Sequence, residues 1–209
     1  LRPELVVAWP DNASRSVTAR LSELGVEVYS PEIQDLADIY ETTRGLGRRL
    51  GLETAADSLV TALQEELESL KRVVAGRERP SVLYVVWLDP PATAGPGTYI
   101  HELIEIAGGR NVFSDAPAMW PQVSLEEVVR RQPDIVILTK GEASSPDPER
   151  LRSAVGWREL RAVRAGRVTQ VEANLFNRPG PRVAEAARRL SELFHPNAFD
   201  AAATPQAIP

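Results

Sequence analysis

Three of the four tryptophans of this 209-residue chain lie at or near the ends of predicted β-strands. Trp9 closes the first strand, Trp87 closes a strand in the middle of the chain, and Trp120 lies in a loop before a helix. Ligands of open parallel sheets bind outside the carboxyl ends of the strands, and indole rings suit a large, flat or partly apolar ligand. We therefore expect these side chains to bind a ligand, although each one alone could equally be a core residue. Trp157 has no such position, and we expect it to pack in the core.

The loop after the predicted strand at residues 168–171 adds candidate ligand contacts at another strand end. They are Asn174, Phe176, Asn177 and Arg178. Amide and guanidinium groups beside aromatic rings would meet the polar edges of a ligand whose faces are apolar.

Groups for catalysis or metal binding are scarce. The chain has no cysteine, which excludes disulfides, thiolate metal sites and thiol nucleophiles. Its two histidines, His101 and His195, are far apart and have no spaced partners, and we expect His101 to be structural. Gly95-Pro96-Gly97 precedes a helix and could hold an anion on backbone amides, but it lacks the lysine and spacing of a phosphate-binding loop. We expect no catalytic residue, no metal site and no cofactor.

The elements that position these residues alternate between strand and helix, which predicts an α/β fold with parallel sheets. Ser124 and Glu127 have the spacing of a capping box at the start of one helix. The predicted strands cover residues 5–9, 26–29, 82–88, 135–138 and 168–171, and the clearest helices cover residues 31–50, 53–75, 98–107 and 181–194.

The helix at residues 53–75 has apolar positions three and four apart, with acidic residues and a lysine on its other face. At about 1.5 Å per residue it spans over 30 Å, enough to join two lobes as a rigid connection. We expect two Rossmann-like α/β lobes: residues 1–51 form a partial N-terminal lobe, 52–77 the connecting helix, 78–195 the C-terminal lobe, and 196–209 a disordered tail.

A repeated pattern supports the two lobes. A proline, an acidic residue and an aliphatic run occur at residues 3–7 and again at residues 133–138. About fifty residues precede the second copy within its lobe, so we expect a comparable stretch to be absent from the first lobe. The N-terminal lobe is therefore predicted to be incomplete.

The charge and the hydropathy of the chain argue against two kinds of partner, nucleic acid and the interior of a membrane. The formal net charge of −5 and the scattered basic residues argue against nucleic acid. No apolar run approaches the roughly eighteen residues that span a bilayer.

Two stretches resemble the periplasmic cobalamin-binding proteins of ABC import systems, within the wider family of siderophore, haem and cobalamin receptors. They are residues 119–128, MWPQVSLEEV, and residues 132–137, QPDIVI. Residues 1–9, 24–26 and 108–113 are also similar, so that the resemblance extends from residue 1 to about residue 195. It implies two α/β lobes joined by one long helix, with a ligand held between them.

The resemblance also implies roles for single residues. Trp9 and Trp120 match aromatic residues that pack against the corrin and its nucleotide arm. Glu126 matches a second-lobe glutamate that docks onto the membrane permease, although on the sequence alone it could equally complement a helix dipole. The corresponding first-lobe position is Arg15, and Asp11 is the nearest carboxylate.

Other positions depart from the family pattern. Ala92 stands where an aromatic residue is expected, and Asn174 and Asn177 stand where acids are frequent, while Arg178 is retained. These departures concern the identity of the ligand more than the fold.

We expect an exported, periplasmic or lipid-anchored monomer that binds cobalamin or a related corrinoid and delivers it to an ABC permease and ATPase complex. A receptor of the same fold for a ferric siderophore or haem is the alternative. An α/β enzyme that uses the cleft is a second alternative, which the scarcity of histidine and of nucleophile–base pairs opposes.

Overall fold

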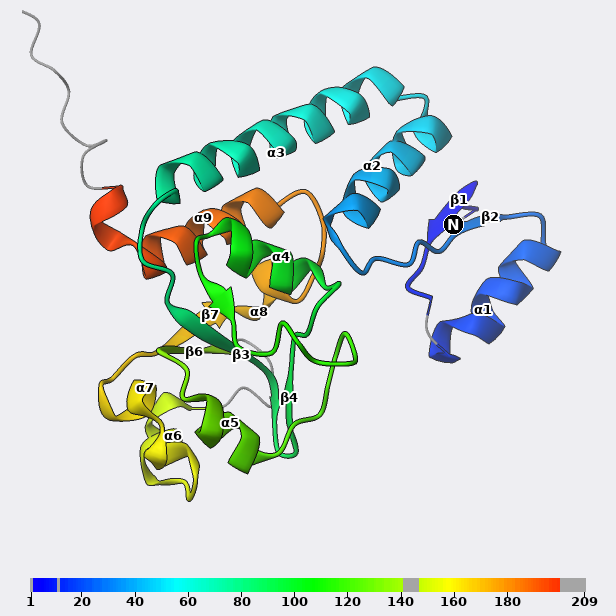
Figure 1. Ribbon diagram of the computed structural model, residues 1–209. Helices are drawn as coiled ribbons and strands as arrows, with labels where there is room; N and C mark the ends of the chain where they lie inside the picture. The colour runs from blue at the N-terminus through cyan, green and yellow to red at the C-terminus, as the bar shows by residue number, and fades with distance from the viewer. Residues whose placement is uncertain (1, 11, 141–146, 200–209) are drawn as a thin grey trace, which may run out of the picture.

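The computed structural model describes residues 2–10, 12–140 and 147–199. Its first lobe is small. Strands β1 (Leu5–Val7) and β2 (Glu27–Tyr29) pair in parallel, with Leu5 opposite Glu27, and helix α1 (Asn12–Glu23) connects them. Figure 1 shows this lobe apart from the larger sheet, beyond one end of α2.

Two antiparallel helices, α2 (Leu36–Leu50) and α3 (Glu53–Val74), follow the first lobe. Gly51 ends α2 in the left-handed conformation, with φ of 66°, which glycine adopts without strain. A side chain at Gly47 would place its Cβ 2.5 Å from the Cβ of Ala56, so glycine allows the two helices to pack closely. The prediction that α2 starts near Pro31 is wrong, because Asp35 and Asp38 form a capping box that begins the helix at Leu36.

The second lobe contains a five-stranded sheet in the order β4-β3-β6-β7, with β5 also pairing with β3. Strands β6 and β7 belong to the parallel part, as expected. Two strands that were not predicted also pair with β3: β5 runs parallel to it and β4 runs antiparallel to it. The strands are β3 (Ser81–Leu88), β4 (Pro91–Thr93), β5 (Arg110–Asn111), β6 (Ile135–Lys140) and β7 (Val168–Glu172).

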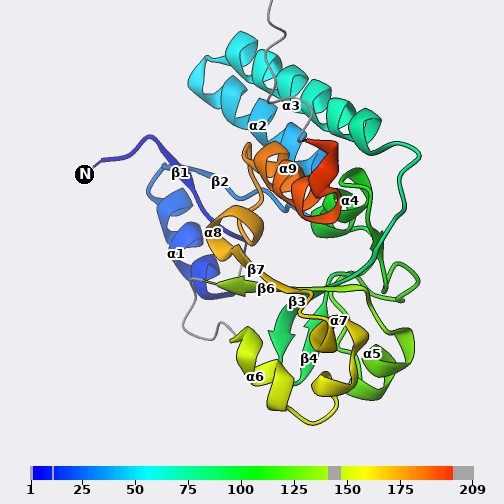
Figure 2. The same ribbon diagram turned by 90° about the vertical axis from the view of Figure 1, so that its left-hand side faces the viewer.

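Helices cover both faces of this sheet. Figures 1 and 2 show α3, α4 and α9 on one side, and α5, α6 and α7 on the other. The remaining helices are α4 (Tyr99–Ile106), α5 (Leu125–Arg131), α6 (Pro148–Ser153), α7 (Arg161–Arg164), α8 (Ala173–Phe176) and α9 (Val183–Phe194), with 3₁₀ turns at Trp157–Glu159 and Pro196–Ala198.

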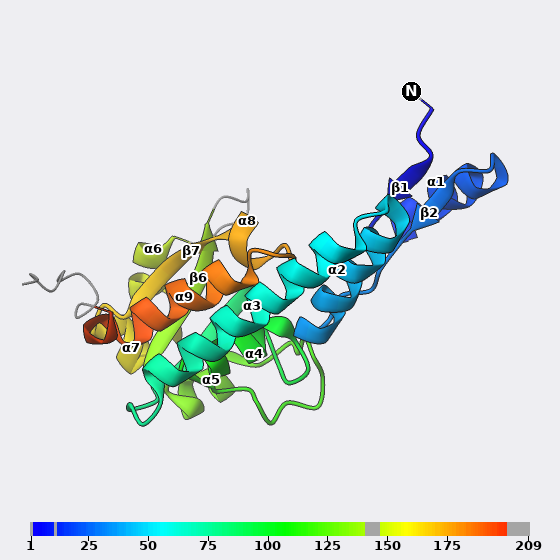
Figure 3. The ribbon, with the colours of Figure 1, turned by 90° about the horizontal axis from the view of Figure 1, so that it is seen from above.

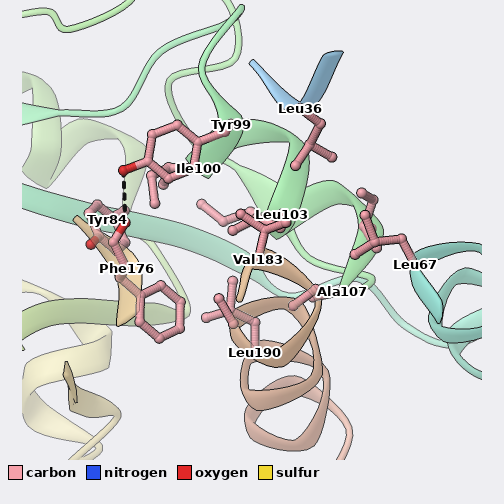
Figure 4. Close-up of a cluster of buried hydrophobic side chains, with 14 of the residues drawn as sticks. Leu36, Leu67, Tyr84, Tyr99, Ile100, Leu103, Ala107, Phe176, Val183 and Leu190 are labelled. Carbon is pink, nitrogen blue, oxygen red and sulfur yellow. Dashed lines mark hydrogen bonds between the residues drawn. The ribbon is translucent and has the colours of Figure 1, made fainter. Parts of the chain in front are cut away.

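Each face of the sheet has its own core. Leu67, Leu103 and Leu190 are buried on the side of α3, α4 and α9 (Figure 4). Trp157 is 5% exposed in the other cluster, which confirms the prediction that it packs in the core.

Helix α3 lies along the second lobe as well as beside α2, as seen from above in Figure 3. Glu66 of α3 forms an ion pair with Arg188 of α9 at 3.1 Å. Leu36 and Ile39 of α2 belong to the same buried cluster as α4 and α9. Helix α2, which we assigned to the first lobe, therefore also packs on the second, and the boundaries of the predicted parts stay a prediction.

The prediction of a disordered tail is wrong for its first residues. Pro196–Ala198 form a 3₁₀ turn, and Phe199 packs against the core cluster. Residues 200–209 lie outside the described residues.

His195 is buried at the end of α9 and should make stability depend on pH. Burial lowers its pKa from the ordinary value of 6.5, so the unfolded chain takes up a proton at a higher pH than the folded chain. The free energy of unfolding should therefore fall as the pH drops below about 6.5. Urea unfolding at about pH 7.5 and about pH 5.5 should show a smaller loss in His195→Gln than in the wild type. Equal losses in both proteins would show that His195 is not responsible.

Candidate ligand-binding surface

The candidate ligand-binding residues were predicted at the edge of the sheet where the parallel strands have their carboxyl ends. Strands β3, β6 and β7 are parallel neighbours, so their last residues lie at the same edge of the sheet. Trp87 lies near the end of β3, is 51% exposed, and donates its indole N–H to the Asp89 carbonyl oxygen at 3.0 Å. Its side chain is therefore held near the strand end while about half of the residue stays exposed.

Trp120 is held by backbone pairing between two loop segments. The N–H of Gly95 donates to the Met119 oxygen at 2.7 Å, and that of Thr93 donates to the Pro121 oxygen at 3.1 Å. These two bonds fix the backbone on both sides of Trp120. Its ring is 46% exposed and meets the ring of Tyr99 edge-on, with 6.4 Å between centroids.

Gly95 makes this close pairing possible. A Cβ at position 95 would lie 2.3 Å from the backbone oxygen of Ala118, so Gly95→Ala should push the Trp120 loop away. We expect the free energy of unfolding to fall by at least about 1 kcal/mol, measured by urea unfolding. Gly180→Ala is the matched control, since a Cβ there meets no atom within 4 Å. A Gly95→Ala protein as stable as Gly180→Ala would contradict this role.

The loop around α8 supplies polar groups near the end of β7. The Asn177 side-chain oxygen accepts from the Tyr84 hydroxyl at 2.9 Å, which ties the loop to the middle of β3. Asn174 and Arg178 are exposed. The structure thus places these polar side chains on the strand end, as the sequence predicted.

Phe176 does not belong to this surface, and the prediction that its ring contacts ligand is corrected. Its side chain is 1% exposed, and its ring centroid lies 6.4 Å from that of Tyr84 within the core. A helical turn follows β7 directly, and that turn directs Phe176 inwards while Asn174 stays outside.

Trp9 lies two residues beyond β1 and is 54% exposed. The backbone before it is fixed, since Ala8 N–H donates to the Tyr29 oxygen at 3.1 Å. That Trp9 and Trp120 line opposite walls of one cleft stays a prediction.

Glu126 is exposed in the first turn of α5. Ser124 caps this helix by accepting from the Glu127 N–H at 3.1 Å, which is one half of the predicted capping box. The carboxylate of Glu127 instead binds Arg130 and Arg131, and these partners lower its pKa. Asp11, the other predicted docking carboxylate, lies outside the described residues.

The other chemical candidates have structural partners. The Nδ1 atom of His101 lies 3.3 Å from the Asn111 side-chain nitrogen, in line with a structural role. The N–H of Gly95 is used by Met119, so it is not available to an anion. Among the described residues, no three histidine, aspartate or glutamate side chains gather as a metal site would require.

Two cavities of about 810 Å³ lie away from the tryptophans. One is at the amino edge of the sheet, where His195 and Arg167 line it, and the other lies between α2, α3 and α4, where Tyr40 and Glu102 line it. Within the described part of the chain, no helix is both long and apolar enough to cross a bilayer.

Tyr84 and Tyr99 were not among the predicted site residues, although the hydroxyl of each donates a hydrogen bond to the α8 segment, to Asn177 and to Phe176. Both are buried, at 1% and 5% exposure. The sequence did hold a signal for them: one tyrosine lies inside an aliphatic strand and the other at a helix start. A buried tyrosine hydroxyl needs a hydrogen-bond partner, so each of these positions indicates a contact with another segment.

The family model of the periplasmic binding proteins matches residues 1–175. The chain belongs to this family. One relative of this periplasmic binding protein is an uncharacterized ABC transporter substrate-binding lipoprotein of Bacillus subtilis. It is 29% identical over 95% of this chain and 64% of its own length. Another is the vitamin B12-binding protein of Salmonella typhimurium, which is 32% identical over 91% of this chain and 68% of its own length. The chain thus spans about two thirds of the length of these relatives.

A solved structure agrees with the fold of this periplasmic binding protein. A possible iron-binding, periplasmic solute-binding protein of Staphylococcus epidermidis superposes with a TM-score of 0.82 at 27% identity, covering 93% of this chain and 77% of that chain. The α/β architecture with parallel sheets is therefore the family's architecture, as expected from the sequence.

Proposed function

We propose that this periplasmic binding protein is the solute-binding component of an ABC import system and that it captures cobalamin or a related corrinoid. The observation that carries the proposal is a set of three half-exposed tryptophans: Trp9 just beyond β1, Trp87 near the end of β3, and Trp120 in the loop before α5. A contiguous exposed apolar patch on a soluble protein marks a binding site, and the proposal takes the three rings to form one such patch. The vitamin B12-binding relative at 32% identity supports the corrinoid as ligand.

The mechanism is binding without chemistry. The indole rings would cover the apolar faces of the macrocycle, and Asn174, Asn177 and Arg178 would meet its polar edges. The described residues assigned to this surface are indole rings, amides and a guanidinium group, so the proposal needs no catalytic step.

Delivery to the membrane would use an exposed carboxylate. Glu126 projects from the first turn of α5 and is exposed, so it can meet arginines of a membrane permease. The partner would be an ABC permease and ATPase complex, the protein would act as a monomer, and it would work outside the cytoplasmic membrane, in the periplasm or as a lipoprotein.

A haem or ferric siderophore receptor is the second candidate. It is favoured by the similarity to the possible iron-binding protein of Staphylococcus epidermidis and by Ala92, where an aromatic residue would be expected for a corrinoid. Both ligands are large chelates that would use the same indole rings.

Thermal unfolding with cyanocobalamin, haemin and a ferric hydroxamate tests the proposal. A ligand at a hundred times its Kd stabilises the folded state by about 2.7 kcal/mol, so the true ligand should raise the melting temperature. We expect cyanocobalamin to do so, with a visible-spectrum change on binding. A shift with haemin or the hydroxamate alone would replace the corrinoid with the second candidate, and no shift with any of them would reject both.

A further inference from the structure

Tyr99, the first residue of α4, joins three segments that are far apart in the sequence. Its backbone N–H donates to the Gln34 oxygen at 2.7 Å, in the linker between the first lobe and α2. Its hydroxyl donates to the Phe176 backbone oxygen at 2.8 Å, drawn as the dashed line in Figure 4. Its ring contacts the ring of Trp120 edge-on. One buried residue therefore connects the linker, the aromatic surface and the α8 loop.

We propose that Tyr99 is a positioning residue for ligand binding: it holds the Trp120 ring and the α8 backbone in the arrangement that a ligand meets. This inference rests on the proposed function of the surface, but it concerns a residue that lies beneath the surface and makes no contact with ligand itself.

The Tyr99 hydroxyl satisfies a backbone group that α8 cannot satisfy alone. Helix α8 has a single turn, from Ala173 to Phe176, and isolated helices this short are unstable. The last carbonyl groups of a helix have no partner within it, and Phe176 provides one of them. Burial raises the pKa of Tyr99, so its hydroxyl keeps its proton and remains a donor at neutral pH.

The start of α4 is itself anchored without the Tyr99 side chain. Glu102 accepts the N–H of Leu36 at 2.7 Å, and Thr98 caps α4 by accepting the His101 N–H at 3.1 Å. These bonds and the Gln34 contact use the backbone or other side chains. Tyr99→Phe should therefore leave α4 in place, keep the ring contact with Trp120, and remove only the bond to α8.

Calorimetric titration with cyanocobalamin tests the positioning role. We expect Tyr99→Phe to bind about threefold to tenfold more weakly, where tenfold corresponds to about 1.4 kcal/mol. The melting temperature should fall by only about 2–4 °C. Tyr40→Phe is the matched hydroxyl deletion, at the cavity between α2, α3 and α4 that no tryptophan lines, and should bind as the wild type does. Val60→Ala, at the buried contact face of α3, should lower the melting temperature without changing affinity.

Amide hydrogen exchange gives a second readout that needs no ligand. Exchange at residues 173–178 should be faster in Tyr99→Phe and unchanged in Tyr40→Phe and Val60→Ala. Unchanged exchange there, or wild-type affinity in Tyr99→Phe, would overturn the proposal. If the wild type fails to bind cyanocobalamin, the corrinoid function is rejected, and the exchange measurement alone decides whether Tyr99 orders α8.

Discussion

Trp120→Ala is expected to weaken cyanocobalamin binding by about 1–3 kcal/mol, because the ligand would lose the burial of one large side chain. The backbone on both sides of Trp120 is fixed by the bonds of Gly95 and Thr93, so the loop should keep its path when the ring is removed. Trp120 is 46% exposed, so a ligand can bury the exposed part of its surface. Isothermal titration calorimetry measures the effect directly.

Two further variants make the result specific. Trp120→Phe keeps an aromatic ring on Tyr99 and should lose less affinity than the alanine variant. Leu24→Ala removes a large apolar side chain that is 68% exposed in the first lobe, and it should bind as the wild type does. Unchanged affinity in Trp120→Ala would remove this residue from the binding surface.

Leu103→Ala should cause the largest loss of stability, about 2–5 kcal/mol in the free energy of unfolding. Leu103 lies in the middle of α4, is 0% exposed, and belongs to the cluster that joins α3, α4 and α9. Figure 4 shows it among Ile100, Val183 and Leu190. Removing its side chain leaves a cavity because the surrounding helices pack on one another and on the sheet, and cannot all move inwards.

Urea unfolding followed by circular dichroism measures this loss. Leu59→Ala is the matched control, since Leu59 lies on α3 and is 40% exposed, and its loss should stay near about 0.5 kcal/mol. Similar losses in the two variants would mean that the cluster around α4 is not packed as the structure describes.

Much of the fold follows from local patterns. The aliphatic run at residues 135–138 predicted a strand buried on both faces, and Val136, Ile137 and Leu138 are 0% exposed in β6. The apolar spacing in residues 53–75 predicted α3, whose buried residues include Val60, Leu67 and Leu70. Such patterns are reliable because the period of apolar residues reports directly which face of an element is buried.

The predictions from the sequence were wrong where contacts with another segment decided the position of a side chain or strand. Phe176 follows a strand end, and strand ends attract ligands, but the single turn of α8 directs its ring into the core. Residues 91–93 were not among the predicted strands, yet they pair with β3 as an edge strand. Glu127 has capping-box spacing, but Arg130 and Arg131 compete for its carboxylate.

The amino-acid pattern alone predicted the α/β class, the long helix α3, the core position of Trp157 and the positions of Trp9 and Trp87 near strand ends. Each of these depends on residues close together in the chain. Only the tertiary structure showed which buried residues bind the α8 segment. The hydroxyl of Tyr99 donates to a carbonyl group 77 positions away, and that of Tyr84 donates to an amide oxygen 93 positions away. Which donor meets which acceptor at such separations depends on how β3, α4 and α8 pack together, and no local period encodes that packing.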